Sequence, residues 1–185
     1  MDKKELRKTL RARAAALPEQ ERRAASRAIA RSVIASDAFR RAETVFAYVS
    51  TALEPDTAPI LEAAWAAGKR VAVPKCGENG AMRALLLTDP DALRPGTYGL
   101  PEPPEDAPEV EPDLILVPCL AASKGGARLG HGGGYYDRYL RWRRAATLCL
   151  CFEALLSEDI PMTELDIPMD CVVTERGCHF KEGTR

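Results

Sequence analysis

One stretch decides the fold: Asp113-Leu-Ile-Leu-Val-Pro118, which leads through a short polar loop into Arg128-Leu-Gly-His-Gly-Gly-Gly-Tyr-Tyr-Asp-Arg-Tyr-Leu140. The apolar run predicts a buried strand that ends at Pro118. Four glycines then fall within residues 130–134, and a helical pattern begins directly after them. Glycines let backbone N–H groups approach an anion, and a helix N-terminus favours negative charge. The stretch therefore predicts a phosphate-binding turn between a strand and a helix.

Two commoner glycine motifs do not fit this turn. Gly125 and Gly130 have the glycine spacing of a P-loop, but His131-Gly132 follows where the P-loop needs Lys-Ser/Thr. Gly130-His-Gly132 opens like a dinucleotide-binding fingerprint, but Tyr135 stands in the place of the third glycine. A plain structural turn is the remaining alternative. It is disfavoured because each extra glycine costs backbone entropy.

Strand and helix patterns alternate along the chain. Helices are expected over residues 3–16, 19–35, 59–67 and 134–143, and strands over residues 44–49, 70–73, 82–87, 114–117, 147–151 and 171–174. Residues 89–112 are rich in Pro, Glu and Asp and predict a long surface excursion. Near-continuous apolar strands between helices favour a parallel sheet covered on both faces. The prediction is an α/β fold: a single three-layer α/β/α domain over residues 1–185, with a mostly parallel sheet and an N-terminal helical pair.

Composition excludes several classes of protein. The chain has 185 residues and a net charge near −1, so no overall basic field would recruit nucleic acid. Basic residues do cluster within Lys3–Arg41, but their helical spacing is typical of a solvated helix face. Association of this segment with RNA is the alternative reading.

Cysteine and histidine usage bears on location and metals. The six cysteines form no C-x-x-C pair, and most lie in apolar runs, so reduced thiols are expected. No segment resembles a membrane span or a signal peptide. The two histidines lie far apart, which disfavours a histidine-based metal site. The expectation is a cytoplasmic monomer without nucleic-acid or membrane partners.

Three segments follow predicted strand ends: Ser50–Thr57, Pro74-Lys75 and the glycine turn. In α/β sheets ligands bind beyond the carboxyl ends of the strands. We therefore expect the three segments to meet at one site.

At these residues the chain resembles the 5-formyltetrahydrofolate cyclo-ligase family, also called 5,10-methenyltetrahydrofolate synthetases. The glycine turn carries the resemblance most specifically. Further segments match in the same order: Lys3–Arg7, Tyr48–Thr57, Gly68–Pro74, Tyr98–Pro103 and Leu165–Asp170. The resemblance implies the same fold class. It also implies an ATP-dependent closure of 5-formyltetrahydrofolate to 5,10-methenyltetrahydrofolate through a phosphorylated formyl intermediate, with Mg²⁺ as cofactor and ATP as co-substrate.

The resemblance also assigns residues. The implied ATP-binding residues are Lys3, Lys4, Arg7, Arg128, Leu129, Gly130, His131, Gly132, Gly133, Gly134, Tyr135 and Tyr136. The implied folate-binding residues are Val49, Glu54, His131, Gly132, Gly133, Gly134 and Tyr135. Arg128 and Tyr136 are the implied catalytic residues, and Asp137 and Asp166 the implied Mg²⁺ ligands. Without the resemblance, Lys3 and Arg7 are solvated helix residues and Asp137 only compensates the helix dipole.

Several positions depart from the family pattern: Cys119, Ala122 and Ser123 after the strand, and Leu155 and Leu165 further on. These departures bear on the folate pocket more than on phosphate chemistry, because the glycine turn is intact. The second hypothesis is therefore a non-catalytic nucleotide-binding relative that has lost folate turnover.

Overall fold

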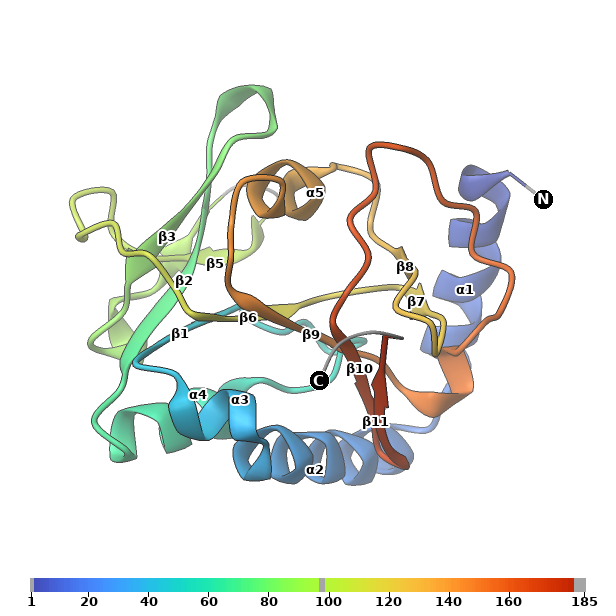
Figure 1. The fold of residues 1–185 in the computed structure, drawn as a ribbon, viewed down its shortest axis with the longest axis horizontal. Coiled ribbons are helices and arrows are strands. Elements are labelled where there is room, and N and C mark those ends of the chain that lie inside the picture. Colours follow the sequence, from blue (N-terminus) through green and yellow to red (C-terminus); the bar gives the residue numbers. More distant parts are fainter. Residues whose placement is uncertain (1, 97–98, 182–185) are drawn as a thin grey trace.

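The computed structural model describes residues 2–96 and 99–181, and a seven-stranded sheet runs through its centre (Figure 1). In spatial order the strands are β11 (Gly177–Phe180), β10 (Cys171–Thr174), β9 (Ala146–Leu150), β6 (Leu114–Val117), β1 (Thr44–Ala47), β2 (Arg70–Cys76) and β3 (Met82–Leu86). The inner pairs, from β10 to β2, are parallel, whereas the edge strands β11 and β3 pair in antiparallel fashion. This sheet confirms the predicted mostly parallel α/β fold.

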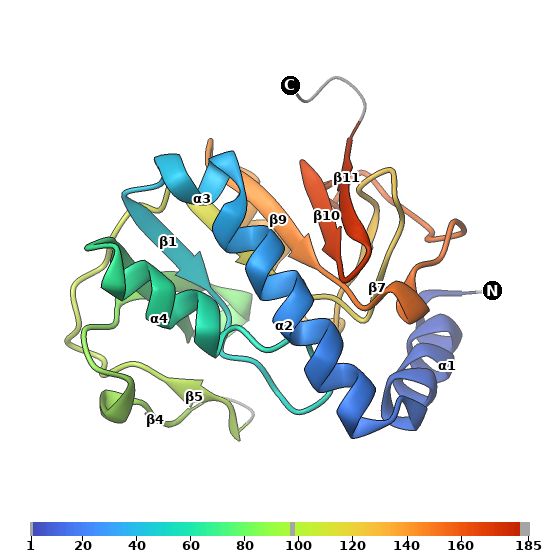
Figure 2. The same cartoon turned by 90° about the horizontal axis from the view of Figure 1, so that it is seen from below.

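Helices cover the two faces of the sheet unevenly. Three helices lie together on one face: α2 (Glu19–Ala35), α3 (Asp37–Arg41) and α4 (Ala58–Ala66) (Figures 1 and 2). In the described part of the chain, the short helix α5 (Tyr135–Leu140) lies over the other face, beside coil and short ribbons. The thinner cover leaves room for a cavity on the α5 side.

The strands are buried because apolar residues occupy both of their faces. Every residue of β1 and of β6 is buried, as expected for central parallel strands. Ile29 and Val33 of α2 are fully buried in the same core. On the α5 side, the ring of Phe46 lies 5.2 Å from that of Tyr139 and 6.3 Å from that of Tyr136. Phe46 thereby packs α5 against the sheet.

The first helix, α1 (Lys3–Ala16), does not join α2 on the helical face. Its Leu6 and Leu10 pack in a separate cluster with Leu129 and Ile160. Figure 1 shows α1 beside the ribbon of β7 (Ala121–Ala122) and β8 (Arg128–Leu129). The expected helical pair therefore exists as two helices with different partners. Hydrophobic spacing located both helices but could not show what each one covers.

Six short helices and strands among the described residues escaped the sequence patterns: α3, β11, the two strands of the β7–β8 ribbon, and the two strands of the hairpin of β4 (Arg94–Pro95) and β5 (Pro101–Glu102). Each is five residues or shorter, which is too short for a clear period. The β4–β5 hairpin lies within the excursion expected at residues 89–112. Tyr98, which opens one of the matching sequence segments, lies outside the described residues.

Aspartates tie neighbouring strands together where they begin. The carboxylate of Asp113 accepts hydrogen bonds from the backbone N–H groups of Glu43 and Thr44, both at 3.1 Å. Asp170 likewise accepts from the N–H and the hydroxyl of Thr147, both at 2.9 Å. These bonds set the register of β6 against β1 and of β10 against β9 at one edge. The opposite ends of the same strands open towards the cavity.

The described helices do not include one long and apolar enough to cross a membrane.

Leu116, fully buried in β6, is the most direct test of this core. Leu116→Ala should lower the free energy of unfolding by about 2–5 kcal/mol, because it removes apolar contacts and leaves a cavity. Leu53→Ala, at a side chain 39% exposed, is the matched control and should change stability by less than about 1 kcal/mol. Urea unfolding at pH 7 measures both. Equal effects would mean that β6 is not at the centre of the core.

Candidate active site

A cavity of about 1140 Å³ opens beyond the carboxyl ends of the parallel strands. Its walls include all three segments expected to converge, through Thr51 and Glu54, Pro74, and the glycine turn. The volume exceeds that of a typical site for one drug-sized ligand, which is roughly 300–1,000 Å³. The cavity is therefore large enough to hold two small substrates side by side.

The glycine turn, residues 130–134, forms part of the cavity wall before α5. Gly132 and Gly134 have φ of +112° and +67°, which side-chain-bearing residues rarely adopt. At Gly130 a Cβ would lie 2.8 Å from a guanidinium nitrogen of Arg128. The turn thus needs glycine both for its backbone path and for the close approach of an arginine.

The helix that follows this turn is shorter than the sequence predicts. It covers Tyr135–Leu140, six residues, rather than 134–143. A helix of this length has a small dipole, so anion binding here must depend mainly on the backbone N–H groups of the turn and on nearby cations. The predicted contribution of the helix dipole is therefore reduced.

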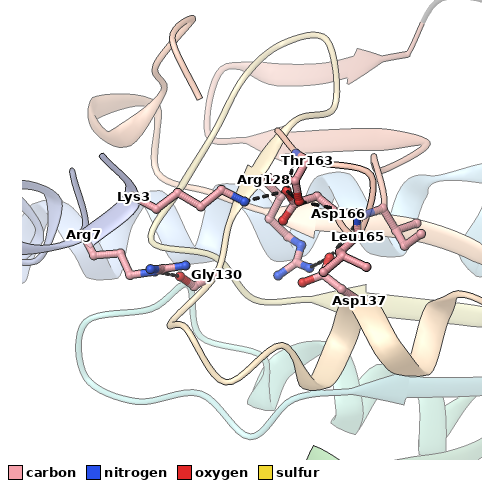
Figure 3. Close-up of polar contacts among 9 residues, drawn as sticks. Lys3, Arg7, Arg128, Gly130, Asp137, Thr163, Leu165 and Asp166 are labelled. Carbon is pink, nitrogen blue, oxygen red and sulfur yellow. Dashed lines mark hydrogen bonds and ion pairs between the residues drawn. The ribbon is translucent and has the colours of Figure 1, made fainter. Parts of the chain in front are cut away.

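A buried ion pair joins the start of the turn to α5. Nη2 of Arg128 donates to Oδ1 of Asp137 at 2.6 Å, and the two side chains are only 4% and 22% exposed (Figure 3). The backbone N–H of Ile167 donates to the same oxygen at 3.2 Å. Asp137 therefore holds three segments together. Nε of Arg128 is buried without a partner among the described residues, so the guanidinium retains a free donor.

A second ion pair brings α1 to the same place. Nζ of Lys3 donates to Oδ2 of Asp166 at 2.5 Å, and the N–H and hydroxyl of Thr163 donate to that oxygen as well (Figure 3). Burial alone would raise the pKa of Asp166. The hydrogen bonds from Lys3 and Thr163 outweigh burial and lower that pKa below its ordinary value. Asp166 is therefore a carboxylate at neutral pH.

Helix α1 also contacts the backbone of the glycine turn. Nε of Arg7 donates to the carbonyl of Gly130 at 2.9 Å, and Nη2 of Arg11 donates to that of His131 at 3.0 Å. Lys3 and Arg7 line the cavity. Lys4 does not: it lies on the exposed side of α1 and is the one predicted site residue that the structure leaves outside. Adjacent helical residues point about 100° apart, which explains the difference.

Glu54 and His131 connect two walls of the cavity. Nε2 of His131 lies 3.0 Å from Oε1 of Glu54, and the N–H of Thr51 donates to Oε2 at 2.9 Å. Burial of Glu54 would raise its pKa, but the hydrogen bonds from His131 and Thr51 lower it below the ordinary value. The loop after β1 is thereby linked to the glycine turn by an ionised carboxylate.

Val49 and Tyr136 add apolar surface to the cavity. The Tyr136 hydroxyl is buried and has no hydrogen-bond partner among the described residues. Burial also raises the pKa of Tyr136, so the phenol keeps its proton and can only donate or accept a hydrogen bond. An unsatisfied buried hydroxyl in a cavity wall is a candidate contact for a ligand.

The carboxylates Asp137 and Asp166 were expected to bind Mg²⁺. Within residues 2–96 and 99–181 no group of three or more His, Cys, Asp or Glu side chains could hold a metal. Mg²⁺ in phosphate-transfer sites commonly uses one or two carboxylates and takes its other ligands from phosphates and water. The donor pair therefore fits Mg²⁺ bound together with a nucleotide, although each carboxylate is engaged by a cation.

The departures from the family pattern lie mostly away from the cavity. Ala122 and Leu155 are buried, Cys119 donates to the carbonyl of Leu150, and Ser123 accepts from the N–H of Ala127 in the β7–β8 turn. Only Leu165, 64% exposed, lines the cavity. The hypothesis that these changes abolish folate turnover therefore loses most of its basis.

Other cavity residues were not anticipated: Cys76, Met82, Leu100, Pro101, Glu102, Arg138, Arg141 and Trp142. The segment Tyr98–Pro103 matched the family, and that was the signal available for Glu102. Arg138 donates to the carbonyls of Gly80 and Gly133, which ties the β2–β3 turn to the glycine turn. This contact spans residues far apart in sequence, so no local pattern predicts it.

Comparison with known proteins agrees with the fold and shows the family of the chain. Residues 1–175 match the model of the 5-formyltetrahydrofolate cyclo-ligase family. A 5-formyltetrahydrofolate cyclo-ligase of Escherichia coli is 34% identical over 171 residues, covering 88% of this chain and 93% of that protein. The enzyme of that name from Mus musculus is 30% identical over 189 residues, covering 94% and 93%.

Solved structures show the same likeness. The 5,10-methenyltetrahydrofolate synthetase of Aquifex aeolicus superimposes with a TM-score of 0.87 at 29% identity, covering 100% of this chain and 95% of that one. A protein of that name from Mycoplasma pneumoniae, at 21% identity, shares the fold with a TM-score of 0.77 over 95% and 99% of the two chains. With a family match over nearly the whole sequence and relatives above 30% identity, the chain is an enzyme, a ligase that belongs to the 5-formyltetrahydrofolate cyclo-ligase family.

Proposed function

We propose that this ligase closes 5-formyltetrahydrofolate to 5,10-methenyltetrahydrofolate at the expense of ATP, releasing ADP and phosphate. One observation carries the proposal: a single cavity joins a glycine turn flanked by Lys3, Arg7 and Arg128 to an apolar wall that includes Val49. The basic part suits phosphates, and the apolar part suits a flat ring system. Two substrates that react with each other would meet in this one space.

The reaction has two steps in this proposal. The formyl oxygen attacks the γ-phosphorus of ATP, the bond to the bridging oxygen breaks, and ADP leaves. The carbon of the resulting imidoyl phosphate is then attacked by N10, which loses its proton. The C–O bond breaks, and phosphate departs with the former formyl oxygen. No protein nucleophile is required, in agreement with a site made of glycines, cations and carboxylates.

The protein residues act by positioning and by charge. Phosphoryl transfer is accelerated chiefly by alignment of the reactants and neutralisation of the phosphate oxygens. The N–H groups of the glycine turn and the guanidinium of Arg128 would bind those oxygens. The unpartnered Tyr136 hydroxyl could donate to an oxygen of the intermediate. Because Tyr136 stays protonated, this would be a hydrogen bond rather than a proton transfer.

Asp137 and Asp166 would hold Mg²⁺ in this proposal. The metal, when bound, would neutralise negative charge on the phosphate oxygens. Lys3 and Arg128, which now pair with these carboxylates, would then be free to turn towards the phosphates. Until the nucleotide binds, the ion pairs with Lys3 and Arg128 would hold the two carboxylates in position and compensate their charge.

The decisive experiment is direct. The purified protein is mixed with ATP, Mg²⁺ and 5-formyltetrahydrofolate, and the near-ultraviolet absorbance of the methenyl product is followed. A rise that requires all three components supports the proposal. Absence of product together with intact ATP binding would instead favour a nucleotide-binding protein without folate turnover.

Asp137→Asn should leave a folded protein that is nearly inactive. Loss of the charge that holds the metal should lower kcat at least about a hundredfold. The same change weakens the pair with buried Arg128, so the free energy of unfolding should also fall, by about 1–3 kcal/mol. Turnover and melting temperature are measured on one preparation across a Mg²⁺ titration. Asp159→Asn, at an exposed residue outside the cavity wall, is the control. Near-normal turnover at low Mg²⁺ would remove Asp137 from the metal site.

The Glu54–His131 link makes a pH-dependent contribution to stability. Because the pKa of Glu54 is lowered on folding, its carboxylate stabilises the protein above the ordinary value of 4.5, and this stabilisation is lost as the pH falls below it. Glu54→Gln should therefore cost about 1–2 kcal/mol at pH 7 and much less near pH 3. Urea unfolding of both proteins at the two pH values tests this, with exposed Glu158→Gln as control. A difference independent of pH would contradict the link.

A further inference from the structure

Glu102 is a buried carboxylate in the cavity wall that the phosphate chemistry does not use. It lies in β5, its side chain is 5% exposed, and it lines the cavity. Oε1 accepts from the backbone N–H of Cys76 at 3.3 Å, and Oε2 lies 3.2 Å from Nζ of Lys75. A charge at this depth needs partners, and these two anchor it against β2.

Gly96, which follows β4, packs against the side chain of this carboxylate. A Cβ at Gly96 would lie 2.3 Å from Cδ of Glu102, so a larger residue at position 96 would displace the carboxyl group from its present position. An ionised carboxylate has about four acceptor positions. Among the described residues, the N–H of Cys76 and Nζ of Lys75 occupy two of them, and the Cys76 thiol is a further, weak donor. Acceptor capacity therefore remains for a ligand in the cavity.

Glu102 and the two cations of α1, Lys3 and Arg7, lie in different parts of the cavity. Figures 1 and 2 show β5 on one side of the molecule and α1, which carries Lys3 and Arg7, on the other. The nucleotide phosphates belong near α1 and the glycine turn, because Lys3, Arg7 and Arg128 supply positive charge there. Apolar Met82, Leu100 and Pro101 line the cavity together with Glu102. This part offers apolar walls and one fixed acceptor pair.

We infer that Glu102 determines folate specificity by accepting paired hydrogen bonds from the 2-amino group and N3–H of the tetrahydropterin ring. The inference rests on the proposed function and extends it to the orientation of the substrate. The two pterin donors lie side by side and match a carboxylate, as the fork of a guanidinium does. Adenine fits less well, because its 6-amino donor lies beside ring nitrogens that are acceptors.

The first test compares Glu102→Gln with Glu105→Gln. Glu105 lies near the same hairpin and pairs with the same Lys75, at 3.4 Å, but it is 70% exposed and outside the cavity wall. Glu102→Gln should raise the KM for 5-formyltetrahydrofolate about 10–100-fold with little change in the KM for ATP. Glu105→Gln should leave both constants nearly unchanged. A rise confined to ATP, or equal rises for both substrates, would overturn the inference.

A substrate analogue separates recognition from a structural role. The wild type should bind 5-formyl-2-desaminotetrahydrofolate about tenfold or more weakly than the natural substrate, because one donor to Glu102 is missing. In Glu102→Gln that preference should largely disappear. If the variant still bound the natural substrate more tightly than the analogue by the same factor, a residue other than Glu102 would bind the 2-amino group.

Cys76 provides a measurement on the wild type that needs neither catalysis nor a stable variant. It is partly buried beside Glu102 and lines the cavity, whereas Cys178 is exposed on β11 at the opposite edge of the sheet. Slow alkylation by a maleimide is quantified for each cysteine by mass spectrometry. 5-Formyltetrahydrofolate should protect Cys76 several-fold more than ATP does and leave Cys178 unaffected. Protection by ATP alone would overturn the inference.

These outcomes are separable from the proposed function. Protection of Cys76 by the folate without any turnover would refute the ATP-driven reaction but support the binding role of Glu102. Normal turnover with an unchanged folate KM in Glu102→Gln would support the ATP-driven reaction and refute the binding role of Glu102.

Discussion

The ion pair between Arg128 and Asp137 is the interaction on which the rest of the site depends. Arg128 is almost completely buried, and an unpaired guanidinium at that depth would be strongly destabilising. Asp137 compensates this charge and also accepts the N–H of Ile167, so it fixes the β8 ribbon, α5 and the segment after Asp166 relative to one another. The glycine turn lies between the two partners of the pair. Its shape is therefore determined at both ends, and its N–H groups are held in place before any anion binds.

Charged side chains join coil segments throughout this part of the molecule. The described loops around the cavity lie outside the seven-stranded sheet, and ion pairs and charge-assisted hydrogen bonds connect them. Lys3 with Asp166 attaches α1, and His131 with Glu54 attaches the loop after β1. Each link involves a group that the family resemblance assigns to a ligand. When substrates bind, these charged side chains would exchange their present partners for groups of the substrates. No further charged side chain would then have to be buried.

The uneven cover of the sheet explains where the candidate active site lies. Three helices seal one face, whereas short α5 and the hairpins leave a large cavity over the ends of the parallel strands. Lys3 and Arg7 of α1 and Glu102 of β5 all line that cavity, and α1 and β5 lie on different sides of the molecule. In the proposed function, phosphates and the folate ring would bind in different parts of this one space.

Local sequence determined the elements with a clear period, and only the tertiary structure determined how charges meet. Apolar runs identified the central strands, and the glycine stretch identified the turn before α5, because both signals lie within a few neighbouring residues. The backbone conformation of residues 128–137 likewise depends on glycines within that segment. In contrast, the pairing of Lys3 with Asp166, the position of Glu102 in the cavity wall and the exclusion of Lys4 depend on how α1, β5 and the later loops pack. These contacts join residues far apart in the chain, and their energy exists only once the sheet has brought the segments together.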